Sequence, residues 1–366
     1  MVIKKVAFLL DSFKKGGAQK MMSYVISCVA ERYERVYLLL EDDSSISYDL
    51  PTNSTIIKIC GKSAKKSFFG KVTSVLWKIK SLKSIIKKEQ ISLICSFGCY
   101  YSFLAALSID KKKTALIGSE RRSPQDLDFV WKKLSKIAYR KCNRVVFQLE
   151  EARDFYGNKI KNKSVIIPNP FLGSEQILHK AKNEKTIVVA AARLEYVKGF
   201  DVAIKALAKV LEKVPDAILR IYGGGDFEGE YGKLIDSLSL RKNIVYKGFS
   251  NSIVEDISNS SLFVLPSRFE GIPNMLLEAL AAGMPCIASN CRPGGPRLLI
   301  GDNERGLLFE NENSDELAEC IIRVLEDETF SLKLSKEAIK VRKLFSPSVI
   351  KKQWVECFAE VENGLK

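Results

Sequence analysis

Apolar, strand-like runs alternate with stretches of helical spacing along this chain, and the alternation occurs twice. In the first half, the runs Val2–Leu10, Val36–Leu40 and Ile91–Phe97 are separated by helix-like stretches such as Gly17–Glu31. Alternation of this kind with short loops is typical of a parallel sheet covered by helices on both faces. The sequence therefore predicts an α/β fold made of doubly wound parallel sheets.

The alternation restarts after a polar stretch at residues 174–185, where Thr186–Ala191 begins a second series of strand-like runs. A length of 366 residues is sufficient for two domains. We expect a Rossmann-like N-terminal domain at residues 1–168, a second at residues 169–345, and a C-terminal helix at residues 346–366 that packs back toward the first domain. The two domains should face a central cleft, because ligands of such sheets bind beyond the carboxyl ends of the strands.

The cysteines, the histidine and the apolar segments exclude several classes of protein. The nine cysteines are an odd number without a Cys-x-x-Cys pair, which argues against a zinc site and a disulfide framework. The single histidine, His179, lies in a polar stretch that we interpret as a solvated linker, so Ser-His-Asp catalysis is not expected. The uncharged segment Ile91–Ile109 is interrupted by Gly98, which favours a buried strand, a turn and a helix over a membrane span. The first apolar run is too short for a signal peptide, which favours a cytoplasmic protein.

The formal net charge of +15 belongs to the first half of the chain. Residues 1–168 carry a net charge of +17 and residues 169–366 a net charge of −2. The segment Lys62–Lys88 holds nine basic residues and no acidic one, with apolar residues at helical spacing. We interpret it as a basic amphipathic helix that rests on an anionic membrane surface. The residues expected at that surface are Lys65, Lys66, Phe68, Phe69, Lys71, Trp77 and Lys78.

Two other interpretations of this segment stay open. A core-packed helix with a solvated lysine face would produce the same spacing. A nucleic-acid-binding surface is less favoured, because no helix-turn-helix, zinc-finger or ribonucleoprotein-type motif accompanies the charge. We therefore expect no nucleic-acid partner.

The most informative stretch is Phe263–Ser289, with the sequence FVLPSRFEGIPNMLLEALAAGMPCIAS. A strand ends at Pro266, a loop follows, and a helix begins near Pro273, because proline suits the first turn of a helix. The loop amides then lie at a helix N-terminus, which favours anions and sugar hydroxyls. Glu270 in the loop and Glu278 one turn into the helix can both accept hydrogen bonds from paired hydroxyls.

Three further loops carry groups suited to phosphate. Arg193 and Lys198 flank the loop after the first strand of the second half, where two cations ahead of a helix suit a diphosphate. Glycine-rich turns at Gly16–Gly17 and Gly223–Gly225 follow two other strands and let the backbone approach a ligand closely. Glu228 stands where a dinucleotide-binding Gly-x-Gly-x-x-Gly motif would need glycine, so such a site is poorly supported.

Together these motifs resemble the retaining glycosyltransferases of family 4, which have the two-domain GT-B architecture. The matching motifs are Gly16-Gly17-Ala18, Arg193-Leu194 with Lys198-Gly199, Gly223-Gly224-Gly225-Asp226, Gly248-Phe249, and Glu270-Gly271-x-Pro-Asn continuing to Glu278-Ala-Leu-Ala. The resemblance is very specific over residues 186–330. In the N-terminal half it is confined to the glycine loop and the order of the elements.

The resemblance implies a role for each matching residue. Arg193 and Lys198 would neutralise the nucleotide diphosphate, and Glu270 would contact the hydroxyls of the donor sugar. These three form the expected catalytic set, and such enzymes need no metal ion and use no obvious protein nucleophile. The expected donor-binding residues, with Glu278 at the ribose and Gly248-Phe249 at the base, are Gly16, Gly17, Gly223, Gly224, Gly248, Phe249, Gly271, Ile272, Pro273, Asn274, Met275 and Glu278.

The chain departs from the family on the acceptor side. Many relatives carry a histidine at the end of a strand where this chain has Gly118-Ser119-Glu120-Arg121-Arg122. We expect Glu120 and Arg121 to contact the acceptor. The loop Cys291–Pro296 resembles one found in members that build lipid-linked or O-antigen glycans, and it is expected to border the donor sugar.

The resulting hypothesis is a retaining glycosyltransferase in the cytoplasm, peripheral on the inner face of the plasma membrane. It would transfer a hexose or N-acetylhexosamine from a nucleotide sugar, with UDP-N-acetylgalactosamine favoured, onto a polyprenyl-diphosphate-linked or other lipid-linked glycan. The product would belong to a cell-surface polysaccharide, an O-antigen or a glycoprotein glycan. A GDP-mannose-type donor is the alternative within the family. A sugar-nucleotide epimerase would share the architecture, but it should carry a catalytic histidine in its cleft.

Overall fold

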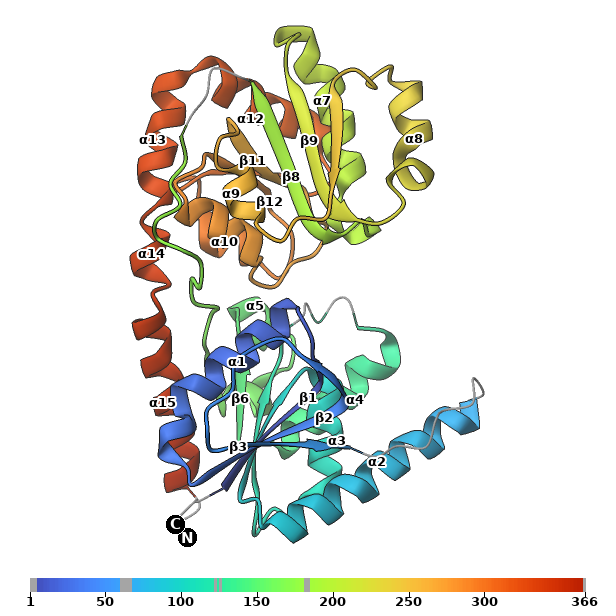
Figure 1. The fold of residues 1–366 in the computed structure, drawn as a ribbon, viewed down its shortest axis with the longest axis vertical. Helices are drawn as coiled ribbons and strands as arrows, with labels where there is room; N and C mark the ends of the chain where they lie inside the picture. Colours follow the sequence, from blue (N-terminus) through green and yellow to red (C-terminus); the bar gives the residue numbers. More distant parts are fainter. Residues whose placement is uncertain (1–4, 60–67, 122–123, 125–126, 181–184, 365–366) are drawn as a thin grey trace. The chain divides into compact units, whose positions relative to one another are not determined.

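Each half of the chain folds around its own parallel sheet. The computed structural model describes residues 5–59, 68–121, 124, 127–180 and 185–364. The chain divides into two compact units, which comprise residues 1–169 with 348–366, and residues 170–347. Both units have helices around an all-parallel sheet (Figure 1), which confirms the predicted α/β fold with two Rossmann-like domains.

The first unit is built on a seven-stranded sheet of order β3-β2-β1-β4-β5-β6-β7, in which all neighbouring pairs are parallel. The strands are β1 (Lys5–Phe13), β2 (Arg35–Ile46), β3 (Ser54–Lys58), β4 (Leu93–Phe97), β5 (Ala115–Ser119), β6 (Arg144–Phe147) and β7 (Ser164–Ile166). Strand β1 is fully buried from Val6 to Leu9, because both faces of a parallel sheet are covered. The strand order reverses between β1 and β4, and ligands of such sheets bind at the carboxyl ends of these strands.

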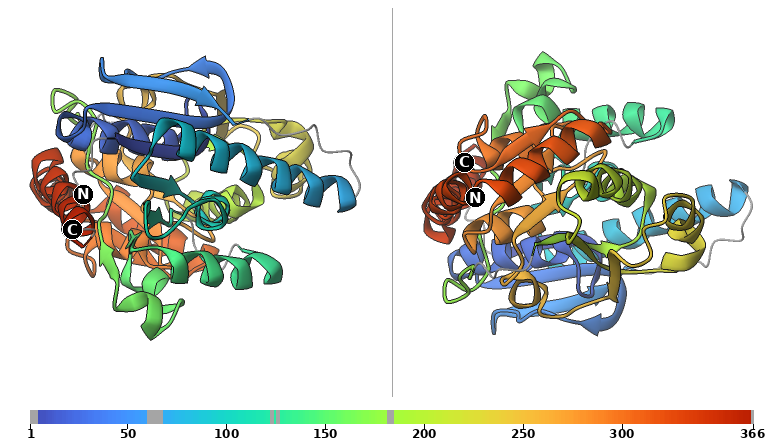
Figure 2. Two further views of the ribbon diagram at one scale, coloured as in Figure 1. Left: turned by 90° about the horizontal axis from the view of Figure 1, so that it is seen from below. Right: turned by 90° about the horizontal axis from the view of Figure 1, so that it is seen from above.

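Helices cover both faces of this sheet. They are α1 (Gly17–Val29), η1 (Ala30–Arg32), α2 (Phe68–Glu89), α3 (Cys99–Ser108), α4 (Phe129–Lys141), α5 (Glu150–Asp154), α6 (Asn158–Lys161) and α15 (Pro347–Asn363). Helix α3 packs between α2 and α4 (Figure 2). The C-terminal helix α15 belongs to the same core: its Trp354 stacks on Phe97 with ring centroids 6.2 Å apart, and its Phe358 stacks on Phe8 at 6.1 Å.

The uncharged segment Ile91–Ile109 forms the predicted strand, turn and helix. Strand β4 ends at Phe97, Gly98 adopts a left-handed φ of 84°, and α3 begins at Cys99. Glycine suits this turn because it carries no Cβ to strain a positive φ. Within the part of the chain that the structure describes, no helix has both the length and the hydropathy of a membrane span.

The second unit holds a six-stranded sheet of order β10-β9-β8-β11-β12-β13, again with parallel pairs. The strands are β8 (Thr186–Arg193), β9 (Ile218–Gly224), β10 (Ile244–Gly248), β11 (Leu262–Leu265), β12 (Cys286–Ser289) and β13 (Leu307–Phe309). The helices are η3 (Tyr196–Lys198), α7 (Phe200–Lys213), α8 (Phe227–Ser237), α9 (Ile253–Ile257), α10 (Asn274–Ala281), α11 (Gly295–Ile300), α12 (Ser314–Glu326), α13 (Glu328–Ala338) and α14 (Val341–Leu344). Phe200 of α7 and Phe309 of β13 are buried in the core that the sheet forms with α7 and α12.

His179 is half-buried in the second unit, not solvated as its polar surroundings suggested. Its backbone amide donates to the carbonyl oxygen of Ala282 at 2.7 Å, and its Nδ1 lies 2.8 Å from the carbonyl oxygen of Ser258. Burial lowers the pKa of His179 from its ordinary value of 6.5, opposed by the hydrogen bond to Ser258. The polar stretch is therefore pinned to the unit by residues distant in the sequence.

We expect this histidine to make the second unit less stable in mild acid. The unfolded chain takes up the proton at a higher pH than the folded chain, so the free energy of unfolding falls as the pH drops below 6.5. His179→Asn keeps an N–H donor near Ser258 but does not titrate. Urea denaturation at about pH 7.5 and pH 5.5 should show a smaller loss for His179→Asn than for the wild type. Equal losses in the two proteins would contradict this assignment.

Candidate active site

Two loops of the second unit bring Lys198 and Glu270 together. Lys198 ends η3 in the loop between β8 and α7, and Glu270 lies in the loop between β11 and α10. The Lys198 ammonium is 2.7 Å from a Glu270 carboxylate oxygen, and the Ser267 hydroxyl donates to the same oxygen at 3.1 Å. Both charged side chains are half-buried. The pair holds a cation and a carboxylate at the carboxyl edge of the sheet, where ligands of such sheets bind.

Gly199 lets these two loops approach each other. Its φ is 67°, and a Cβ at this position would lie 2.0 Å from the carbonyl oxygen of Pro266. A side chain would therefore both strain the left-handed backbone and force the loops apart. The requirement for glycine explains why Lys198 is followed by this residue.

Arg193 ends β8 and stays on the surface. Its side chain is 77% exposed and its guanidinium is 3.2 Å from the Glu195 carboxylate. Exposed ion pairs of this kind contribute little to stability. The structure does not join Arg193 to the Lys198–Glu270 pair, and its expected contact with the diphosphate stays a prediction.

The loop before α10 lies against the loop after β12. The amide of Glu270 donates to the carbonyl oxygen of Arg292 at 3.3 Å, and a Cβ at Gly295 would lie only 1.5 Å from the carbonyl oxygen of Gly271. The predicted neighbour loop Cys291–Pro296 is thus placed beside Glu270. Helix α10 begins at Asn274 after Pro273, whose side chain has no group that could cap it, so the positive end of the helix lies at this loop.

The remaining predicted residues of the β11–α10 segment have different exposures. Ile272 and Pro273 are buried and shape the loop, whereas Gly271, Asn274, Met275 and Glu278 are half-buried. Glu278 follows Asn274 by one helical turn, which places both on the same side of α10. The expected roles of Glu270 at the sugar and Glu278 at the ribose stay a prediction.

A tyrosine supports the glycine-rich turn after β9. The hydroxyl of Tyr246 in β10 donates to the carbonyl oxygen of Gly223 at 2.6 Å, and its ring stacks on Phe227 at 4.5 Å. Gly224 accepts a hydrogen bond from the amide of Leu194 at 2.9 Å, which ties the turn to the β8 loop. The tyrosine thus stabilises the turn that is predicted to bind the donor.

The expected base-binding turn follows β10. Gly248 has a φ of 70°, and Phe249 exposes 61% of its surface beside it. An exposed aromatic ring next to a glycine suits stacking against a flat ligand. The expected binding of the nucleotide base by Gly248 and Phe249 stays a prediction.

Gly16 and Gly17 lie at the start of α1 in the first unit. Gly16 is the N-terminal cap, its amide donates to the Tyr48 hydroxyl at 3.0 Å, and that hydroxyl donates back to the Gly16 carbonyl oxygen at 3.0 Å. Gln19 donates to Asp11 at 3.1 Å across the same turn. The turn has a defined shape at the carboxyl end of β1.

Glu120 is enclosed within the first unit, which corrects its expected role as an acceptor contact. Its carboxylate accepts hydrogen bonds from the hydroxyls of Tyr139 at 2.8 Å and Tyr156 at 3.2 Å, and from the amide of Arg121 at 3.0 Å. Burial, together with the Glu120 charge, raises the pKa of Tyr139 well above its ordinary value, so the tyrosine stays a donor. The carboxylate organises the interior and is only 3% exposed.

Arg121 also serves the interior of the first unit. Its guanidinium lies 4.7 Å from the centroid of Phe97 and 5.3 Å from that of Trp354, and it donates to the Asn169 side chain at 3.2 Å. Burial lowers the pKa of Arg121 to about 10. Its contacts tie α15 to the sheet, and the expectation that Arg121 contacts the acceptor stays a prediction.

The expected membrane residues fall into three groups. Trp77 is 41% exposed, with the Lys80 ammonium 5.3 Å from its ring centroid. Lys78 is a correction, because its half-buried ammonium turns inward to Glu41 at 2.6 Å and to the Tyr100 hydroxyl at 3.0 Å. The positions outside the described residues are Lys65 and Lys66, together with the side chains of Phe68, Phe69 and Lys71.

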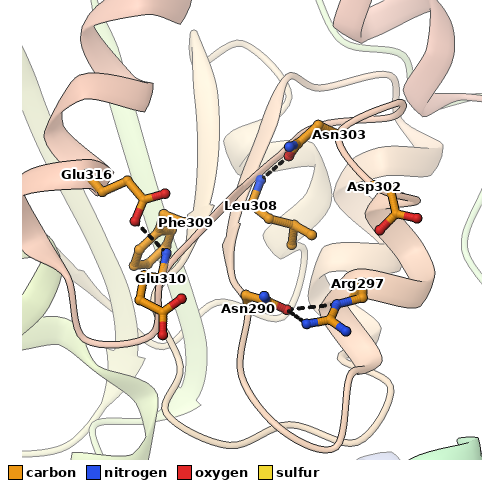
Figure 3. A pocket seen from close by; sticks show the side chains of 8 residues that line it. All are labelled: Asn290, Arg297, Asp302, Asn303, Leu308, Phe309, Glu310 and Glu316. Atoms are coloured by element: carbon orange, nitrogen blue, oxygen red, sulfur yellow. Dashed lines mark hydrogen bonds between the residues drawn. The ribbon is translucent and has the colours of Figure 1, made fainter.

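A polar cavity of about 340 Å³ is lined by residues of β13 and of the segments that precede it and that follow β12 and β13 (Figure 3). Arg297 donates to Asn290 at 2.7 Å across it, and Asn303 accepts from the amide of Leu308 at 2.6 Å. No sequence motif pointed to this cavity. Among the described residues, no three histidines, cysteines or carboxylates are grouped in a way that suits a metal ion.

Sequence reasoning missed Ser267, Arg268 and Tyr246. Each of them contacts a predicted site residue or the loop that carries one. The partners of Arg268 and Tyr246 are distant in the chain, and Ser267 meets Glu270 only because of the way their shared loop folds. A polar residue at the end of a strand is usually solvated, so its type carries no signal of such a contact.

Comparison with known proteins agrees with this geometry. Residues 175–341 match the family described as Glycosyl transferases group 1. An uncharacterized glycosyltransferase of Haemophilus influenzae is 23% identical over 363 residues, which cover 96% of this chain and 99% of that protein. The GalNAc-α-(1→4)-GalNAc-α-(1→3)-diNAcBac-PP-undecaprenol α-1,4-N-acetyl-D-galactosaminyltransferase of Campylobacter jejuni is 24% identical, with 98% of this chain and 99% of that protein covered.

The fold is also that of a solved structure. The Anabaena protein HepE in complex with UDP-glucose superposes with a TM-score of 0.78 at 17% identity, and the match covers 97% of this chain and 99% of HepE. This similarity confirms the expected GT-B fold. The fold, the matched segment and the named relatives together indicate a glycosyltransferase, and the match to Glycosyl transferases group 1 is confined to residues 175–341.

Proposed function

We propose that this protein is a retaining glycosyltransferase that moves N-acetylgalactosamine from UDP-N-acetylgalactosamine to a lipid-linked glycan. The observation that carries the proposal is the Lys198–Glu270 pair, 2.7 Å apart beside the N-terminus of α10. The Lys198 ammonium can pair with a diphosphate, and the Glu270 carboxylate can accept hydrogen bonds from sugar hydroxyls. A sugar diphosphate needs both groups at one place. The name of the Campylobacter relative supports both the sugar and the undecaprenol-linked acceptor.

In the proposed reaction, the bond between C1 of the sugar and the β-phosphate oxygen breaks while the acceptor hydroxyl bonds to C1 on the same face. The acceptor's proton passes to the departing phosphate oxygen, so UDP leaves and the configuration at C1 is retained. Negative charge gathers on the diphosphate as it leaves. Lys198, Arg193 and the N-terminus of α10 would stabilise that charge without a metal ion. Glu270 would hold the sugar hydroxyls, and Glu278 the ribose.

We further propose that the first unit works on an anionic membrane surface. Helix α4 contains five basic residues and no acidic one, and α2 contains six basic residues and a single glutamate at its end. Exposed apolar side chains accompany these charges on both helices, namely Val72, Leu76, Trp77, Phe129, Val130 and Ile137. Basic charge interspersed with exposed apolar groups is what an anionic lipid surface attracts. A lipid-linked acceptor would be reached on that surface, as in polysaccharide or lipopolysaccharide assembly.

A donor screen tests the enzymatic proposal. UDP-N-acetylgalactosamine at 100 times its dissociation constant should stabilise the protein by about 2.7 kcal/mol in thermal unfolding. UDP-glucose, UDP-N-acetylglucosamine and GDP-mannose are the comparison ligands. Hydrolysis assays on the ligands that stabilise then identify the sugar that is transferred. Stabilisation by GDP-mannose alone would overturn the choice of UDP-N-acetylgalactosamine.

We expect transfer to continue in excess EDTA. The positive charge that a metal would supply to the diphosphate comes in this proposal from Lys198, Arg193 and α10. Initial rates with and without EDTA, measured with the donor identified above, check this expectation. A strict requirement for added Mg²⁺ or Mn²⁺ would contradict it.

A further inference from the structure

Arg268 is a buried cation in the loop between β11 and α10, two residues before Glu270. It is only 5% exposed, although arginine is among the residues least often buried without partners. Its guanidinium donates four hydrogen bonds to three different segments of the second unit. A buried charge with several hydrogen-bonded partners fixes the geometry of the segments that pair with it.

The first segment is the start of α7. Two guanidinium nitrogens of Arg268 donate to the two carboxylate oxygens of Asp201, both at 2.9 Å. Burial opposes ionisation of Asp201, but the Arg268 hydrogen bonds and charge prevail and lower its pKa. This bidentate pair has the planar geometry that only arginine provides.

The second segment is η3, which ends at Lys198. Arg268 donates from its guanidinium to the carbonyl oxygen of Tyr196 at 2.7 Å and from its backbone amide to that of Val197 at 2.8 Å. The guanidinium also lies 3.8 Å from the centroid of the Tyr196 ring. Residues on both sides of Lys198 are therefore bound to one side chain.

The third segment follows β13. Glu312 accepts from the Arg268 Nε at 2.6 Å, and Asn311 donates to the Arg268 carbonyl oxygen at 3.2 Å. These contacts bind both the side chain and the backbone of Arg268 to a segment outside the β8–α7 loop. The guanidinium is therefore held by Glu312 as well as by the residues around Lys198.

We infer that Arg268 is a positioning residue, which holds the backbone around Lys198 so that its ammonium stays next to Glu270. Lys198 has a long, flexible stem, so the position of its ammonium depends on the backbone that Arg268 binds. The role of Lys198 at a diphosphate rests on the proposed function. The hydrogen bonds by which Arg268 holds the β8–α7 loop, which we call the clamp, do not depend on it. Arg268 itself touches neither substrate nor reacting atoms in this proposal.

Arg268→Lys tests the inference, with Arg342→Lys as the matched control. Lysine keeps the positive charge but cannot span Asp201, Glu312 and the Tyr196 carbonyl oxygen together. Arg342 is another multiply bonded arginine of the same unit, which donates to the carbonyl oxygens of Ala281, Glu175 and Ile177. Amide hydrogen exchange in residues 195–201 should rise roughly tenfold in Arg268→Lys and stay unchanged in Arg342→Lys. Equal exchange in the two variants overturns the clamp.

Kinetics separate positioning from general destabilisation. Arg268→Lys should lower kcat by about 10- to 100-fold and change the donor KM less, because misplacing a charge-stabilising group weakens the transition state most. When Lys198 is already replaced by alanine, Arg268→Lys should lower kcat by less than about threefold further. The reason is that Arg268 acts on kcat through Lys198. Losses that simply add in the double variant overturn the positioning role.

A second variant guards against misfolding. Asp201→Asn keeps the volume of the partner but turns an amide toward the guanidinium, and it should raise exchange in the same residues. If Arg268→Lys does not unfold cooperatively, Asp201→Asn decides in its place, and unchanged exchange in it overturns the clamp. If the wild type hydrolyses and transfers no nucleotide sugar, the proposed function fails, and the exchange measurement still decides the inference about Arg268.

Discussion

Lys198→Ala is expected to lower turnover of the nucleotide-sugar donor by about 100- to 1,000-fold while the second unit stays folded. The ammonium is the charged partner of Glu270 at 2.7 Å and lies in a loop at the carboxyl edge of the sheet. A cation at this place neutralises the diphosphate as it leaves, and its removal leaves that developing charge uncompensated. Initial rates at saturating donor measure the effect.

Arg193→Ala should also reduce turnover strongly, because this exposed cation is free to leave Glu195 for a phosphate. Lys213→Ala is the matched control, since it removes an exposed lysine from the last turn of α7, distant in the chain from the predicted catalytic residues. Thermal unfolding verifies that all three variants fold. Activity close to that of the wild type in both Lys198→Ala and Arg193→Ala would overturn the diphosphate assignment.

Charge reversal on α4 is expected to release the protein from anionic vesicles. Lys133 and Arg140 are exposed on α4, in a row with Val130 and Ile137 at helical spacing. Each basic residue near an anionic surface contributes about 1 kcal/mol, so Lys133→Glu with Arg140→Glu should weaken binding by roughly 100-fold. Sedimentation with vesicles containing phosphatidylglycerol measures this at low salt.

The control for the membrane proposal is the same reversal elsewhere. Lys333 and Lys336 are exposed on α13 of the second unit, and replacing both by glutamate changes the net charge by the same amount. This control should bind the vesicles as the wild type does. Equal loss in both double variants would show that net charge alone governs binding, and unchanged binding of the α4 variant would show that its face is merely solvated.

Local sequence patterns determined the architecture and the loops of the candidate site. Hydrophobic periodicity distinguishes strand from helix over a few residues, which is why the segment Ile91–Ile109 divides at Gly98 as predicted. The elements from Pro266 to Glu278 could be predicted in the same way, because the end of a strand, a loop and the start of a helix each have a local sequence pattern. The chemistry concentrated at strand ends follows from that order of elements.

Only the tertiary structure decided which polar side chains are held in the interior and which stay accessible. Glu120 is bound by Tyr139, Lys78 by Glu41 and Arg268 by Asp201, and the members of each pair are 19 to 67 residues apart. No local pattern brings such partners together, since their approach depends on how strands and helices pack. His179 became half-buried for the same reason, because Ser258 and Ala282 meet it only in the fold. The sequence by itself thus determined the elements and the chemical groups available to the site, whereas long-range packing determined which of those groups remain free to act.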